Sequence, residues 1–231
     1  MHDIRDAVVQ DANDSEGTGV WANLEAMKAH VPTPSLSAAH YLRLASADIL
    51  LRDSINTSLG TISPGRLDME VDQKAMFLED LRKAVYAAIL ACFIQGLDLL
   101  ARVNAHEGWG VNLQHVARIW RAGCIIKSDY ITDLFERHYV QNPGRHPLCG
   151  EEIATEVKRC WPSLKQVVLK GVEVDAHVPC LSTTLEYLKY SGSTDLPTNF
   201  TEAQLDCFGA HGFDLKSEPI GILSKGRSVS V

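Results

Sequence analysis

The sequence predicts an all-α protein, on three observations. Apolar residues recur every three or four positions through most of the 231-residue chain, which is the spacing of one face of a helix. No stretch of any length alternates apolar and polar residues as a half-buried strand would. No segment repeats within the sequence. We therefore expect a single helical domain over residues 1–231, with a helical core at about 17–211 and a tail at 212–231.

Composition and charge exclude several classes of partner. Hydrophobic residues make up 45% of the chain and charged residues 22%, as in ordinary globular proteins. A formal net charge of −7 argues against a nucleic-acid backbone or an anionic membrane as partner, because both require a basic face. We see no apolar run near the roughly 18 residues of a membrane span, and the polar, acidic start is unlike a signal peptide. A cytoplasmic protein is expected.

The cysteines and histidines predict no metal site. The six cysteines are scattered without a C-x-x-C pair, and the nine histidines form no H-E-x-x-H motif. A structural zinc site needs closely spaced ligand pairs, so buried, reduced thiols are the simpler prediction.

Four segments precede the centre of the chain. Weak periodicity over residues 1–16 predicts one short helix. Gly17-Thr18-Gly19 then opens a helix that reaches about Val31; its backbone N–H groups could cradle a phosphate, although a plain capped turn is the better explanation of so common a motif. Pro34 begins a helix that runs to about Arg52. Residues 54–73 lack periodicity and are predicted to form a loop.

The centre of the chain is predicted to be a helical hairpin. One long helix is expected from Leu78, with Gly96 placed where a second backbone could approach closely. Glycines at 108 and 110 end it, and Asn112 is a plausible N-cap for a second helix. The run 119–128 carries little charge and is predicted to be buried. The apolar stripe of the long helix consists of Leu81, Val85, Ile89, Cys92, Leu99, Leu100 and Val103.

The remaining chain is predicted to contain five more helices. They are expected at 129–140, 151–159, 163–174, 179–190 and 199–209, with prolines and glycines marking several of the boundaries. The last twenty residues, rich in Gly, Ser and Lys, cannot pack alone and are expected to be extended or ordered against a partner subunit.

Several motifs in the right order resemble one family. They are Glu16–Trp21, Tyr41-Leu42-Arg43, Gln95-Gly96, Gly108-Trp109, Asn112-Leu113, Ile119–Arg121, Gly123–Ile126, Ser128, Leu196–Asn199 and Ala203–His211. From about Val8 to Gly221, the chain resembles the C-terminal helical domain of the 6-phosphogluconate dehydrogenase family. That family makes ribulose 5-phosphate by NADP-linked oxidative decarboxylation.

The resemblance implies a homodimer without its own cofactor. In the family, the nucleotide binds an N-terminal Rossmann domain, and the lysine and glutamate that transfer protons lie in a helical segment just after that domain. Both parts precede the region of the family that this chain resembles. This sequence has no G-x-G-x-x-G motif and no βαβ pattern, so we expect no NADP binding and no other cofactor. The resemblance also implies tail exchange, in which each tail docks on the partner subunit and completes its pocket.

Four residues are carried over as candidates for the site. Arg43, Thr18 and His211 match family positions that line the substrate pocket, His211 being delivered by the partner's tail. His211 and Glu16 are the candidate proton-handling groups. The alternatives are that His211 only caps the last helix, that Glu16 is a solvated turn residue and that Arg43 is a surface arginine.

The pocket departs from the family pattern at four positions. Glu16 and Val20 stand where the family has lysines, Leu205 replaces an arginine that clamps the phosphate, and Cys207 replaces a tyrosine. Such changes predict weak binding of a phosphorylated sugar acid, because they remove cationic partners of the phosphate. We thus expect a repurposed homodimer that binds another small molecule at the subunit interface or catalyses a cofactor-free reaction. The alternatives are the helical part of a genuine or split NADP-dependent decarboxylating dehydrogenase, and a structural protein that forms mixed dimers.

Overall fold

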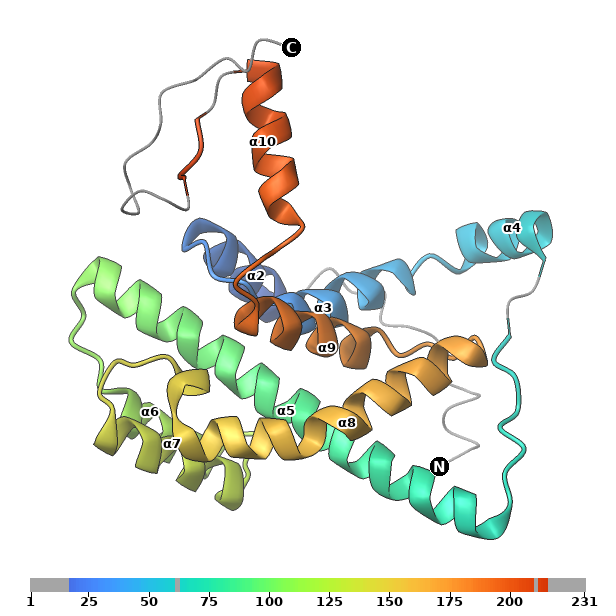
Figure 1. Cartoon of the computed structure of the whole chain (residues 1–231), viewed down its shortest axis with the longest axis horizontal. Coiled ribbons are helices and arrows are strands. Elements are labelled where there is room, and N and C mark those ends of the chain that lie inside the picture. The colour runs from blue at the N-terminus through green and yellow to red at the C-terminus, as the bar shows by residue number, and fades with distance from the viewer. Residues whose placement is uncertain (1–16, 61–62, 210–211, 216–231) are drawn as a thin grey trace. The chain divides into compact units, whose positions relative to one another are not determined.

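A computed structural model describes residues 17–60, 63–209 and 212–215 (Figure 1). Those residues contain nine α-helices, one 3₁₀ turn and no strand, so the all-α prediction is confirmed. The chain divides into two compact units, residues 1–188 and 189–231. The elements are α2 (Gly17–Lys28), α3 (Pro34–Ala45), α4 (Ile49–Leu59), α5 (Val71–Glu107), α6 (Leu113–Trp120), α7 (Asp129–Gln141), η1 (Pro147–Cys149), α8 (Glu151–Glu173), α9 (Pro179–Gly192) and α10 (Thr198–Gly209).

The core of the first unit is built on α5. Helix α8 packs along α5, and α6 packs against α7, as Figure 1 shows. Phe93 of α5 stacks on Phe135 of α7 with ring centroids 5.9 Å apart, and its edge meets Trp120 of α6 at 5.8 Å. The fully buried aliphatic side chains around these rings are Leu90, Ile94, Leu97, Ile153 and Leu164.

The buried face of α5 differs from the predicted stripe. Val85 and Ile89 of that stripe are 43% and 44% exposed, whereas the neighbouring face with Ala84 and Ala87 is buried. Because α5 is apolar almost all round, periodicity alone could not choose the face. Gly96 was predicted to admit a second backbone, and this is wrong: a Cβ there would meet only a ring carbon of Trp120, at 3.6 Å.

Helix α5 is also the one helix in the described part of the chain that is long and apolar enough to cross a membrane. The sequence was predicted to contain no apolar segment near the length of a membrane span, and by composition this prediction is wrong. However, 56% of the apolar window is buried inside the protein, and a buried core helix passes the same test. Length and composition alone therefore do not make α5 a membrane span.

Two predicted helix boundaries were wrong, one because of a local cap and one because of tertiary packing. The helix expected from Pro34 to Arg52 is two helices, since Asp48 restarts the chain as the N-cap of α4 and accepts the Leu51 N–H at 2.9 Å. As a result, α4 extends into the predicted loop at 54–73. Conversely, the helices expected at 151–159 and 163–174 are one helix, α8, with Pro162 inside it. Its buried face continues on both sides of Pro162, and Ser163 donates a hydrogen bond of 2.6 Å to Asp80 of α5.

Other boundaries agree with the sequence. Asn112 caps α6, as predicted, by accepting the backbone N–H groups of Gln114 and His115. The following run at 119–128 was predicted to be buried and is instead mostly exposed, with Ile125 fully exposed, because α6 ends at Trp120 and the chain turns over the surface. The helix predicted within residues 1–16 lies outside the described residues.

In the second unit, α10 forms close to its predicted range. It buries none of its residues, and Phe200, Leu205 and Phe208 on it are exposed. Asp206 accepts the backbone N–H of Gly212 at 2.7 Å, which ties the chain after the helix back to it. Most of the predicted tail lies outside the described residues.

Candidate functional site

Two of the four candidate site residues can be placed. Thr18 is the second residue of α2, and Arg43 lies in the last turn of α3; both are exposed. Glu16 and His211 lie outside the described residues, so their predicted proton-handling roles stay predictions.

Helices α2 and α3 meet next to both placed residues. Gly19 lies against His40 so closely that a Cβ on Gly19 would be 2.5 Å from the imidazole Nδ1. Asn23, which is buried, donates a hydrogen bond of 2.7 Å to the carbonyl of Gly19 and holds the first turn of α2. The contact joins the turn that carries Thr18 to the residue one helical turn before Arg43. We call residues 17–23 and 40–43 the α2–α3 corner.

A buried polar junction fixes α3 on the core. Ser35 is the second residue of α3, and its N–H is one of the amides that a helix cannot satisfy internally. Gln95 of α5 accepts that N–H at 3.1 Å and donates to the Ser35 hydroxyl at 3.0 Å. The same hydroxyl lies 2.9 Å from that of Thr184 on α9. Gln95 therefore caps α3 from another helix, where the N-cap Thr33 makes no side-chain cap of its own.

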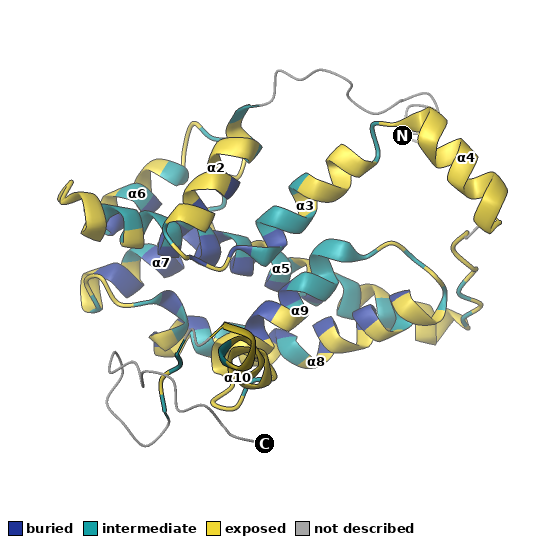
Figure 2. Cartoon of the chain, turned by 90° about the horizontal axis from the view of Figure 1, so that it is seen from above, coloured by how far each residue is buried: buried dark blue, intermediate teal, exposed yellow. Residues whose placement is uncertain are grey.

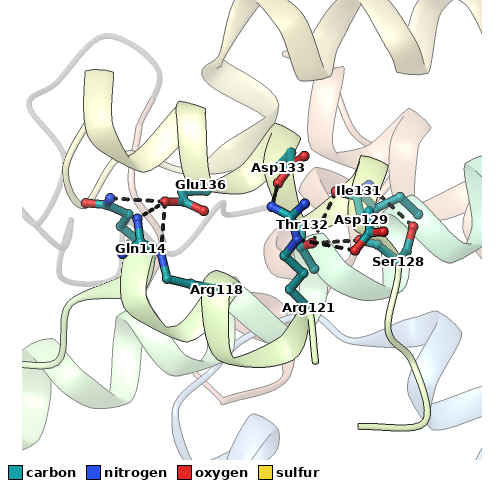
Figure 3. A network of polar contacts seen from close by, with 9 residues as sticks. All are labelled: Gln114, Arg118, Arg121, Ser128, Asp129, Ile131, Thr132, Asp133 and Glu136. Carbon is teal, nitrogen blue, oxygen red and sulfur yellow. Dashed lines mark hydrogen bonds and ion pairs between the residues drawn. The ribbon is translucent and has the colours of Figure 1, made fainter. Parts of the chain in front are cut away.

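Ion pairs fix α6 on α7 on the other side of the core. Figure 3 shows Arg118 contacting Glu136, and Arg121 contacting both Asp129 and Asp133. The Arg118 guanidinium, by donating hydrogen bonds, holds the pKa of Glu136 below its usual range. Sequence reasoning noticed Trp120-Arg121 as a motif but not this pairing, because the partners are on another helix.

Two cavities lie away from the α2–α3 corner. One of about 380 Å³ lies between α7 and α8, and its lining includes Arg137, His138 and Glu152. One of about 600 Å³ lies between the ends of α2 and α5, where Lys28 pairs with Glu25 and His106 with Glu107. Neither is lined by Thr18 or Arg43. Most of the polar side chains that line these cavities already form hydrogen bonds or ion pairs with one another, so few of them are available to bind a ligand.

The prediction of buried thiols holds for only one of the six cysteines. All six cysteines are free thiols; Cys160 is buried, while Cys149 and Cys207 are exposed. Among the residues placed by the structure, no group of histidine, cysteine, aspartate and glutamate side chains could hold a metal ion. The expectations of no metal and no cofactor are not tested by this finding.

These observations define the class as an all-helical domain that is built round one 37-residue helix, with α3 fixed on that helix by buried hydrogen bonds. The chain belongs to the 6-phosphogluconate dehydrogenase family: residues 2–226 match the model of the 6-phosphogluconate dehydrogenase C-terminal domain. The predicted resemblance is therefore confirmed.

Individual relatives agree with this assignment. The chain is 41% identical over 230 residues to the decarboxylating 6-phosphogluconate dehydrogenase of Emericella nidulans, covering 98% of this chain and 46% of the relative. It is 33% identical over 215 residues to the enzyme of Ovis aries, covering 91% and 43%. A solved 6-phosphogluconate dehydrogenase of Plasmodium falciparum superposes with a TM-score of 0.83 at 30% identity, over 94% of this chain and 46% of that one. The chain thus spans about half the length of these relatives.

Proposed function

We propose that the chain is a homodimeric member of its family whose α2–α3 corner takes part in binding a small molecule other than a phosphorylated sugar acid. The observation that carries the dimer is the amount of apolar helix surface that this chain leaves exposed. The observation that carries the change of ligand is the loss of basic residues at the positions that match the family's phosphate contacts.

Helix α4 supports the dimer most directly. It has eleven residues and buries none of them, although Leu50 and Leu59 are 83% and 74% exposed. Figure 2 shows α4 exposed along its whole length. An isolated helix shorter than about 12–15 residues is marginal in water, so apolar packing against another surface would be its main source of stability.

Helix α5 provides a second apolar surface. Leu78, Val85 and Ile89 recur at the spacing of one helix face, and all three are exposed. A further set of exposed side chains lies on α3 and α4 and at the start of α5: Leu42, Leu44, Ile49, Leu51, Ile55 and Met76. Together with Leu50 and Leu59, these residues expose roughly 400–700 Å² of apolar area, if a fully exposed aliphatic side chain counts for about 60–120 Å². One side of a standard interface buries about 800 Å² in total, a little over half of it apolar.

The change of ligand is supported by the charge of the residues at the positions that match the family's phosphate contacts. A charge-assisted hydrogen bond is worth about 1.5–3 kcal/mol, and Leu205 and Glu16 each remove one cationic partner of the phosphate if the resemblance holds at these positions. Two such losses predict binding weaker by about a hundredfold or more. Arg43 and Thr18, which are retained, would still orient a polar or singly charged ligand.

Light scattering tests the dimer. We expect a dimeric mass at micromolar concentration, and a monomeric mass for Leu50→Glu or Ile89→Glu. Leu169→Glu is the matched control, because Leu169 is a half-exposed leucine on α8, outside the proposed surface. A monomeric wild-type chain, or a Leu169→Glu variant that dissociates as readily, would contradict the proposal.

Calorimetry with 6-phosphogluconate tests the ligand. We expect little or no binding by the wild-type chain, and measurable binding by the double variant Glu16→Lys, Leu205→Arg. Glu151→Lys with Leu169→Arg, which adds the same three positive charges on α8, controls for surface charge alone. Micromolar binding by the wild-type chain would instead favour the second candidate function.

That second candidate is the helical part of a decarboxylating 6-phosphogluconate dehydrogenase. The 41% identity to the Emericella nidulans enzyme over 98% of this chain favours it. In that case, mixing the chain with an N-terminal half of such an enzyme should produce NADP reduction that depends on 6-phosphogluconate. If each half alone and the mixture are inactive, this candidate fails.

A further inference from the structure

His146 lies in the connection between α7 and α8, directly before the 3₁₀ turn η1. Its side chain is about one-third exposed, and its Nδ1 accepts the backbone N–H of Leu148 at 3.2 Å, which makes it the N-cap of the turn. An acceptor nitrogen carries no proton, so the neutral ring holds its proton on Nε2. His146 therefore needs its unprotonated Nδ1 to hold the turn.

The other ring nitrogen faces the core. Nε2 of His146 lies 3.9 Å from Oδ2 of Asp98, a residue of α5 that is only 8% exposed. Arg102, one turn further along α5, places its Nε 3.9 Å from the other carboxylate oxygen. The Asp98 carboxylate is thus shared between a permanent cation and a side chain that can become one.

The remaining neighbours come from α7 and from the connection itself. His138 and Tyr139 of α7 are both buried, and Nε2 of His138 interacts with the carbonyl of Arg145 at 2.9 Å. Burial is the main influence on His146 and lowers its pKa below the ordinary value; Arg102 and His138 lower it further, while the Asp98 carboxylate opposes them. In the folded protein His146 therefore stays neutral to lower pH than a solvated histidine does.

We propose that His146 is a proton-operated switch at the junction of α7, η1 and α8. Uptake of one proton converts Nδ1 from an acceptor into a donor, so that two N–H groups face each other and the cap on Leu148 is lost. The same proton gives the ring a positive charge opposite Asp98. Protonation thus exchanges the cap of the turn for an ion pair with α5 and releases the segment Pro147–Cys149.

The released segment borders a cavity. Gly150, directly after the turn, lines the 380 Å³ cavity between α7 and α8 together with the first residues of α8. Gly150 also fits closely against His138, since a Cβ there would lie 2.3 Å from its Nδ1. A turn that opens at low pH would therefore loosen the first turn of α8 and widen access to this cavity.

The sign of the pH effect follows from the lowered pKa. Above the ordinary histidine pKa of about 6.5, both the folded and the unfolded chain carry a neutral His146 and the full stability is present. As the pH falls below that value, the unfolded chain takes up the proton first, so stability is lost until the pH passes the folded pKa. One proton changes the unfolding constant by at most about tenfold per pH unit.

His146→Asn is the variant that isolates the switch, because asparagine caps a turn with its carbonyl oxygen and does not titrate. We expect the unfolding constants of the wild-type and variant chains to diverge as the pH falls below about 7, the wild type losing more stability. Asp98→Asn should enlarge the pH effect in the wild-type background, since it removes the charge that stabilises the imidazolium. Parallel curves for wild type and His146→Asn would overturn the proposal.

A second measurement does not depend on whether the variants fold. Nitrogen chemical shifts of the wild-type His146 ring should show the proton on Nε2 at neutral pH and a pKa below about 6.5. The Leu148 amide should lose protection from hydrogen exchange with the same midpoint. A pKa at or above the ordinary value, or a Leu148 amide whose protection does not follow the titration, would also overturn the proposal.

Discussion

Replacing Gln95 with leucine tests whether the cap that α5 provides for α3 stabilises the protein. Gln95 is fully buried, and leucine has nearly the same size, so the substitution leaves little cavity. It removes the acceptor of the Ser35 N–H at 3.1 Å and the donor to the Ser35 hydroxyl at 3.0 Å. The hydroxyl keeps its contact with Thr184 at 2.9 Å, whereas the buried N–H loses its side-chain partner.

The magnitude follows from that unpaired amide. A buried donor without an acceptor costs about 1–3 kcal/mol, whereas removing both partners of a hydrogen bond would be nearly neutral. We expect Gln95→Leu to lower the free energy of unfolding by about 1–3 kcal/mol. In a chain of this length, each kcal/mol corresponds to a melting temperature lower by about 2–4 °C.

Urea unfolding followed by circular dichroism measures the change. Gln166→Leu is the matched control, since Gln166 is exposed on α8 and its replacement should change stability by less than about 0.5 kcal/mol. Because α3 carries Arg43, we also expect Gln95→Leu to weaken any ligand that binds at the α2–α3 corner. If the two variants unfold at the same urea concentration, the cap contributes nothing and the reasoning is refuted.

Three further substitutions have expected signs, each measured by urea unfolding. Tyr139→Phe should raise the free energy of unfolding by about 1 kcal/mol, because the Tyr139 hydroxyl is buried without a hydrogen-bond partner; a decrease would indicate that the hydroxyl is bonded in solution. Pro162→Ala should stabilise α8 by about 1–3 kcal/mol, since alanine restores an N–H inside the helix; no gain would mean that α8 bends around the proline without cost. Leu97→Ala, in the core, should lose about 2–5 kcal/mol, while Ile125→Ala, fully exposed, should lose almost nothing, and equal losses would contradict the assigned core.

The sequence predicted the fold through signals that act locally. Helical periodicity, the N-cap Asn112 and the break at Gly108 each depend on residues within a turn or two of one another, and each was found in the structure. The family was visible for the same reason, since its motifs are short runs of neighbouring residues. These signals do not depend on which face of a helix is buried.

The predictions that failed concern features that local sequence signals do not decide. Helix α5 is apolar on several faces, so only the packing of α8 decided that Val85 lies at the surface and Ala84 in the core. Pro162 is a strong local signal for a helix end, but the continuous buried face of α8 outweighs it. A low charge content at 119–128 could not distinguish a buried run from an exposed apolar turn.

The candidate site divides in the same way. Family motifs mark Thr18 and Arg43 in the α2–α3 corner one by one, and their roles in binding stay predictions. The groups that position the corner and the switch could not be predicted from the sequence. Gln95 contacts Ser35, and His146 lies close to Asp98, although the members of each pair are far apart along the chain and no local pattern links them. The sequence by itself determined the helical class of the fold and the family, because caps and periodicity are local. Only the tertiary structure decided which polar groups are buried together, because burial depends on every helix that packs against them.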